Sequence, residues 1–92
     1  MLTEVYIFQS PNKGRFCSGV FSTKEKAEEW IKKYELNGVL TIYPVDEAAY
    51  DWAIRMGYFK AKKENESTPD FVAGFSSASQ IHFHYEHGEL IS

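Results

Sequence analysis

The chain has 92 residues, which is long enough for one folded domain but too short for two, and 43% of them are hydrophobic and 16% aromatic, which is enough apolar surface for a core. Its formal net charge of −3 argues against a general nucleic-acid binder, because such proteins need a basic face. The single cysteine excludes an internal disulfide and a cysteine-based zinc knuckle, and the absence of a signal peptide or of ~20 consecutive apolar residues predicts a cytoplasmic protein without a membrane partner.

Two strands are predicted at the start of the chain. Residues 4–8 (EVYIF) carry apolar side chains at odd and even positions, which is typical of an inner strand of a sheet. The turn sequence SPNKG leads into residues 15–21, the expected antiparallel partner. Gly19 in this second strand indicates a bulge or a close backbone approach.

An amphipathic helix follows. Ser22 is the expected N-cap, and Glu25 three residues later completes a capping box. Asn37 and Gly38 are expected to end the helix, since either residue accepts a left-handed conformation. The stripe predicted to be buried consists of Ala27, Trp30, Ile31 and Tyr34.

A third strand and a second helix come next. Residues 39–43 are strand-like and are stopped by Pro44. Asp46 is the expected cap of a helix that runs to Met56, with Gly57 as its terminator. This helix is apolar on most sides, so we expect it to be buried on two sides or to contact a partner.

The last third contains a polar, charge-rich connection at residues 60–69, expected to be a mobile loop, and two apolar segments. Residues 71–75 suggest a short strand, and residues 81–85 a better one that ends in a turn at His87. The order β-β-α-β-α-(β)-β predicts an α+β fold: a single-domain two-layer sandwich over residues 1–92, with a mostly antiparallel sheet and two helices on one face.

The last strand carries the candidate polar or metal-binding face. Period-2 alternation places Gln80, His82, His84 and Glu86 together, opposite Ile81, Phe83 and Tyr85. His82 and His84 would lie about 7 Å apart at Cα, close enough to share a divalent metal ion, with Glu86 as an oxygen ligand. A catalytic zinc site usually has three protein ligands, so the polar side of an ordinary strand is the first explanation of this face, and a metal site and a small acid–base pocket are the alternatives.

Other motifs assign no catalytic residue and no cofactor. The serines of residues 75–79 (FSSAS) lack the second glycine of a nucleophile elbow and are expected to be turn or capping residues. No phosphate-binding loop is present. Cys17 is expected to be a small packed residue.

Aromatic residues gather around the second predicted helix. Core packing is the first explanation, but Tyr and Trp are also enriched at protein interfaces. Tyr50 and Trp52 are therefore the candidate interface for a protein partner or for a second copy of the chain.

Four blocks of sequence, RFCSGVFST, KAEEWIKKYELNGVLTIYPVDE, YDWAIRMGYF and FVAGFSSASQIHFHYEHG, resemble a family of short bacterial proteins classed as a domain of unknown function. The similarity runs from about Val5 to Gly88. The resemblance implies a compact stand-alone bacterial domain with no established activity, and it supplies no catalytic residues.

These observations favour a small cytoplasmic binding or interaction module over an enzyme. The acidic balance suggests a regulatory or immunity-like role against a basic partner. The alternative is a small metal-dependent or histidine acid–base enzyme that uses His82 and His84.

Overall fold

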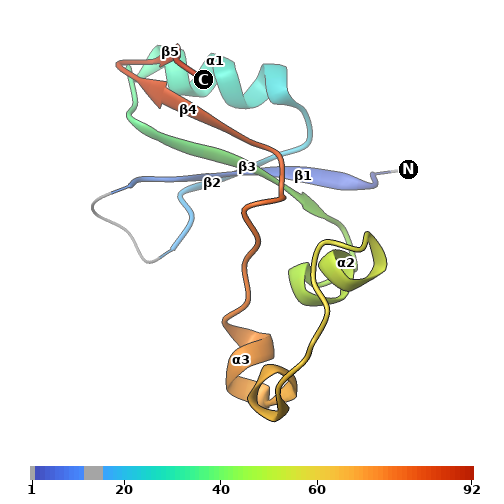
Figure 1. Cartoon of the computed structure of the whole chain (residues 1–92). Helices are drawn as coiled ribbons and strands as arrows, with labels where there is room; N and C mark the ends of the chain where they lie inside the picture. Colours follow the sequence, from blue (N-terminus) through green and yellow to red (C-terminus); the bar gives the residue numbers. More distant parts are fainter. Residues whose placement is uncertain (1, 12–15) are drawn as a thin grey trace. The chain divides into compact units, whose positions relative to one another are not determined.

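The computed structural model describes residues 2–11 and 16–92. The chain divides into two compact units, unit 1 (Met1–Val45 and Gln80–Ser92) and unit 2 (Asp46–Ser79), and Figure 1 labels their strands and α-helices. Most of the predicted SPNKG turn lies outside the described residues. Within the described ranges, no helix combines the length and the apolar character that a bilayer crossing requires.

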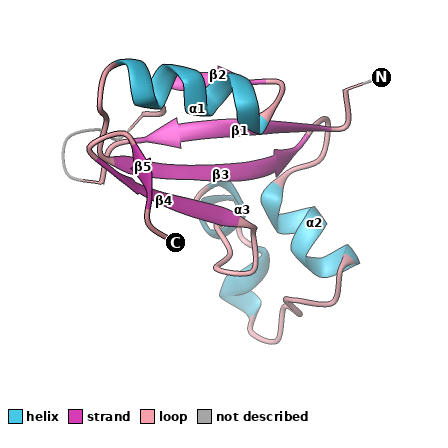
Figure 2. Cartoon of the chain, turned by 90° about the horizontal axis from the view of Figure 1, so that it is seen from above, coloured by secondary structure: helices cyan, strands magenta, loops and turns pink. Residues whose placement is uncertain are grey.

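Unit 1 is built on a five-stranded antiparallel sheet with the strand order β2-β1-β3-β4-β5 (Figure 2). The predicted inner strand is confirmed, since β1 lies between β2 and β3. The two-residue β5, which the sequence did not predict, completes the sheet. The strands are β1 (Glu4–Gln9), β2 (Gly19–Phe21), β3 (Gly38–Pro44), β4 (His82–Glu86) and β5 (Glu89–Leu90).

The core of unit 1 lies between this sheet and helix α1 (Lys24–Lys33), which packs on β1 and β2. Trp30 extends the core at its edge, because its ring packs against Phe8 and Phe21 with centroids 5.5 and 5.4 Å apart. A helix layer on an antiparallel sheet confirms the predicted α+β class. The fully buried cluster consists of Phe8, Ala27, Ile31, Leu40 and Tyr85, each at most 3% exposed.

Both ends of α1 differ from the prediction. The N-cap is Thr23 rather than Ser22, because the Thr23 hydroxyl accepts a hydrogen bond from the Lys26 backbone N–H at 3.1 Å. The helix ends at Lys33, and its C-cap residue Tyr34 is 58% exposed instead of buried, since the stripe facing the sheet is centred on Ala27 and Ile31.

Gly38 does not end the helix. The left-handed residue after α1 is Glu35 (φ 53°), and Gly38 is a buried first residue of β3. A Cβ atom at this position would lie 2.6 Å from the Gln9 backbone oxygen and would also collide with the Phe8 ring. A close approach of neighbouring backbone, rather than a helix stop, therefore requires glycine here.

Unit 2 contains α2 (Ala49–Arg55), a 3₁₀ helix η1 (Glu64–Ser67) and α3 (Pro69–Ala73). Four rings hold it together, with centroids 4.9 to 6.3 Å apart. The Tyr50 hydroxyl donates a hydrogen bond to the Glu66 backbone oxygen at 2.9 Å, which ties α2 to η1. The four rings are those of Tyr50, Phe59, Phe71 and Phe75.

Three predictions for unit 2 are corrected. No strand forms at residues 71–75: residues 71–73 belong to α3, because the Thr68 hydroxyl caps the Phe71 N–H and Pro69 occupies the first helical turn. Asp46 does not cap α2: it lies in a turn at φ 63°, and the helix begins at Ala49. The expected loop at 60–69 contains η1, so unit 2 has more helical structure than predicted.

Candidate functional site

The outer surface of β4 carries the two histidines predicted to share a face. His82 and His84 are exposed, whereas Phe83 is half-buried and Tyr85 is only 3% exposed. On β3, Thr41 is the cross-strand partner of His82 and Val39 that of His84. The histidines therefore lie on the face of the sheet opposite to α1, as strand alternation requires.

The two imidazole rings are in contact. Their centroids are 5.2 Å apart and their planes are inclined by 80°. His82 Nδ1 lies 2.8 Å from the Gln80 backbone oxygen. Because a carbonyl oxygen only accepts hydrogen bonds, Nδ1 is the donor in this contact, which leaves Nε2 as the ring nitrogen that can serve as a ligand.

Gln80 does not join this face as a side chain. It is 3% exposed, and its amide nitrogen donates to the Ile42 backbone oxygen at 3.4 Å. It precedes the first residue of β4, so the period-2 alternation does not extend to it. Gln80 acts on the face through its backbone carbonyl, which orients the His82 ring.

Glu86 and His87 lie at the turn end of β4. Glu86 is exposed and pairs across the hairpin with Glu89, so two carboxylates stand opposite one another. His87 adopts a left-handed conformation (φ 49°), and its N–H donates to Asn37 Oδ1 at 2.7 Å. His87 thus belongs to the turn, as predicted, and not to the histidine pair.

A shallow hollow of about 240 Å³ is lined by residues of β1, of the segment after it and of β3, and the histidines themselves do not line it. Its lining includes Val39 and Thr41, the cross-strand neighbours of His84 and His82. Across residues 2–11 and 16–92, no three His, Cys, Asp or Glu side chains are grouped to hold one metal ion. The described residues thus offer two imidazoles, and not the three-ligand set of a catalytic zinc centre.

The two residues of the predicted interface have different surroundings. Tyr50 is half-buried among the rings of unit 2, where it packs against Phe59, Phe71 and Phe75. Trp52 instead packs on Tyr58, with ring centroids 5.5 Å apart. Met56 and Tyr58 are 46% and 53% exposed. Trp52, Met56 and Tyr58 together form a surface that we call the α2 patch.

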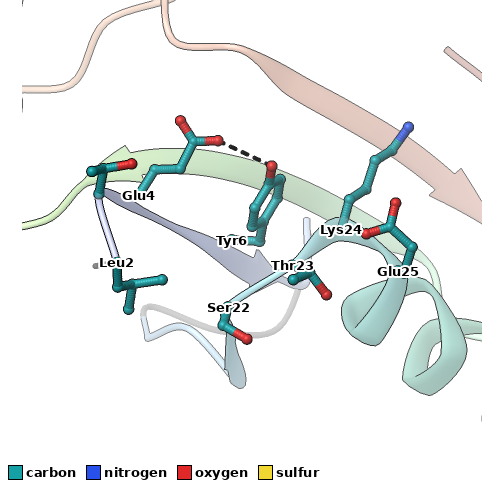
Figure 3. A pocket seen from close by; sticks show the side chains of 8 residues that line it. Leu2, Glu4, Tyr6, Ser22, Thr23, Lys24 and Glu25 are labelled. Carbon is teal, nitrogen blue, oxygen red and sulfur yellow. Dashed lines mark hydrogen bonds between the residues drawn. The ribbon is translucent and has the colours of Figure 1, made fainter.

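An open pocket of about 580 Å³ lies where β1 meets the start of α1, and no sequence motif predicted it (Figure 3). The Tyr6 hydroxyl donates to Glu4 Oε2 at 3.0 Å, and this hydrogen bond, together with burial, raises the pKa of Tyr6. Tyr6 is therefore a proton-bearing donor near neutral pH and is unsuited to be a base. The only signal in the sequence is the i, i+2 spacing of Glu4 and Tyr6 on one strand.

The cation at this pocket already has protein partners. Lys24 Nζ lies 4.1 Å from the centroid of the Phe83 ring and 3.9 Å from Glu28 Oε2. The Tyr85 hydroxyl donates to the same Glu28 oxygen at 2.7 Å. Lys24 and Glu28 thus link α1 to β4, which gives the pair a structural role.

The serine-rich segment and the cysteine were expected to have structural roles, and the structure shows the surroundings of both. Ser77 Oγ accepts a hydrogen bond from the Ser79 N–H at 3.1 Å, which is the geometry of a turn serine. Cys17 is exposed rather than packed, because β2 begins two residues later, at Gly19.

Comparison with known proteins gives a family but no characterised relative. No curated protein and no solved structure matches the chain. The family model described as a domain of unknown function (DUF7710) matches residues 5–91, which confirms the family resemblance over nearly the whole sequence. The chain belongs to the DUF7710 family.

Proposed function

We propose that this domain is a protein-interaction module of the bacterial cytoplasm and that it docks through the α2 patch. The exposure of Met56 and Tyr58 next to Trp52 carries this proposal. Trp, Tyr and Met are the residue types enriched at protein interfaces, and clustered exposed apolar side chains mark contact sites. The exposed thiol of Cys17 is compatible with a reducing compartment.

The small interior of unit 2 supports the same proposal. Within residues 46–79, all of which are described, Ala53 is the one fully buried residue. A unit of this size gains little free energy from its own core. Covering the α2 patch would add apolar burial that the unit cannot supply by itself.

A second copy of this chain is the partner that the patch fits best. Charges of both signs flank the patch: Asp51 and Arg55 belong to α2, and Glu47, just before the helix, accepts hydrogen bonds from Arg55 on both carboxylate oxygens at 2.9 Å. A surface with both signs is self-complementary under two-fold symmetry, because each patch can meet the opposite charge of its mate. The proposed complex is therefore a homodimer.

Sedimentation velocity over a wide range of protein concentration tests this proposal. We expect concentration-dependent dimerisation, which Tyr58→Ser and Met56→Ser should each weaken about ten-fold or more. Tyr34→Ser is the matched control, because Tyr34 is a similarly exposed aromatic residue of unit 1 (58%). A chain that stays monomeric throughout, or equal weakening by the control, would overturn the proposal.

A further inference from the structure

We propose that His82 and His84 form a binding site for one divalent late transition-metal ion, such as Zn²⁺, on the sheet face opposite to α1. This site lies in unit 1 and does not depend on the α2 patch, which belongs to unit 2. Three observations support the site: the separation of the two rings, the hydrogen bond of His82 Nδ1 and the surroundings of the pair.

The ring separation matches what such an ion imposes. Zn–N bonds are about 2.0–2.1 Å long, so a tetrahedral ion bound to two imidazoles holds the ring centroids about 5 Å apart. The observed separation is 5.2 Å. The positions i and i+2 on a strand place both side chains on the same face, and the side-chain conformations bring the two rings to this separation.

The hydrogen bond of His82 orients its ring so that Nε2 is available to bind a metal ion. Metal-binding histidines usually donate their second N–H to a carbonyl or carboxylate, which fixes the tautomer and the ring orientation. His82 Nδ1 makes this contact with the Gln80 carbonyl at 2.8 Å. Gln80 is itself held in place, because it is buried and its side chain donates to the Ile42 backbone oxygen.

The histidine pair is open to solvent, and negatively charged side chains lie at the end of the same hairpin. Both histidines are exposed, so water can fill the remaining coordination positions of a bound ion. Glu86 and Glu89 oppose one another at the end of the same hairpin. A cation near His84 would reduce the repulsion between these two carboxylates.

Isothermal titration calorimetry with Zn²⁺ alone tests the site. We expect one ion per chain in the unmodified protein. In both His82→Ala and His84→Ala the affinity for Zn²⁺ should fall by about ten-fold or more, since even an outer contact of a metal ligand is worth 10–100-fold. Both side chains are exposed, so neither variant removes part of the core. His87→Asn is the matched control, because it removes the third histidine and Asn tolerates its left-handed φ.

Binding that is absent in the unmodified protein, or that survives both alanine variants, would overturn the site. Loss of binding in His87→Asn to the same extent would also overturn it. As a second measurement, ¹⁵N chemical shifts of the imidazoles report the tautomer: His82 should be the Nδ1–H form, and its Nε2 resonance should move when Zn²⁺ is added. Sedimentation of the metal-free protein tests the α2 patch separately, so each proposal can fail by itself.

Discussion

The two units of this chain use their aromatic residues differently. In unit 1, Phe8 and Tyr85 are 2% and 3% exposed and lie between a five-stranded sheet and a helix. In unit 2, the four clustered rings are only half-buried, and the helices have seven residues or fewer. Unit 1 therefore gains stability from burial, whereas unit 2 relies on ring contacts near its surface.

The contacts that hold unit 2 are also more local. The Glu66 carboxylate accepts hydrogen bonds from the backbone N–H groups of Lys62 and Lys63 at 2.7 and 3.1 Å, and these bonds lower the pKa of Glu66. In unit 1, by contrast, β3 pairs with β4 across about forty residues of chain. Regions with few buried apolar contacts open first, so unit 2 should be the less stable part of the molecule.

Leu40→Ala should produce the largest loss of stability, because Leu40 is 0% exposed on the central strand β3. Removing its side chain leaves a cavity, and we expect the free energy of unfolding to fall by about 2–5 kcal/mol. Urea denaturation followed by tryptophan fluorescence measures this loss. Val20→Ala is the control, because Val20 is 59% exposed and should cost about 0.5 kcal/mol or less. Similar losses in both variants would contradict the assigned core of unit 1.

Gly38→Ala should come next, because the added Cβ would meet the Gln9 backbone oxygen inside the sheet. Neither β1 nor β3 can move freely, and we expect a loss of about 2–3 kcal/mol in urea denaturation. Gly57→Ala is the comparison in unit 2. Gly57 has φ +80° but nothing within 4 Å of the added atom, so only backbone strain of about 1 kcal/mol is expected. A larger loss at Gly57 than at Gly38 would contradict this account of the close approach in β3.

The sequence predicted what short-range patterns determine. The inner position of β1, the buried Ala27 and Ile31 of α1 and the alternation in β4 follow from side-chain periodicity, and all three are confirmed. Residues 71–75 were misassigned because an apolar run of that length fits a strand as well as a helix. The preceding Thr68-Pro69 pair contained the helix-start signal that distinguishes the two.

Side-chain periodicity also predicted part of the candidate site, but not the features that depend on packing. Alternation placed His82 and His84 on one face, but it could not show that β4 begins at His82 and leaves Gln80 buried. Tyr50 and Trp52 are two residues apart on one helix, and only the packing separates their environments. The pocket at Glu4 and Tyr6 depends on how β1 meets α1, which no local pattern specifies.

Tyr85→Phe should show how the burial of an aromatic residue in unit 1 makes stability depend on pH. Burial, followed by the hydrogen bond to Glu28, raises the pKa of Tyr85 above its usual value, so the native state holds this proton more tightly than the unfolded chain does. The stabilising contribution is therefore complete below a pH of about 10, the pKa of an unfolded tyrosine, and is lost as the pH rises through the native-state pKa.

We expect the unmodified protein to exceed Tyr85→Phe by about 1.5 kcal/mol in unfolding free energy near neutral pH, as for a hydrogen bond to a charged group. The difference should shrink in urea denaturation performed at successively higher pH above about 10. A difference that stays constant across the alkaline range would show that the Tyr85 hydroxyl does not titrate with unfolding.

Tyr50→Phe should cause the smallest loss of stability, and it tests most directly whether the two units unfold independently. It removes the hydrogen bond to the Glu66 backbone oxygen and keeps the ring contacts, so we expect a loss of about 0.5–1.5 kcal/mol confined to unit 2. Each unit contains one tryptophan, Trp30 in unit 1 and Trp52 in unit 2. Trp30→Phe and Trp52→Phe backgrounds therefore report the unfolding of each unit separately.

In these backgrounds, Tyr50→Phe should lower the urea midpoint of the Trp52 signal and leave that of the Trp30 signal nearly unchanged. Tyr34→Phe is the matched control, because it removes an exposed hydroxyl from unit 1. Equal shifts of both tryptophan signals would mean that the chain unfolds as one cooperative body, so that the half-buried rings of unit 2 are stabilised by the whole molecule rather than by their own contacts.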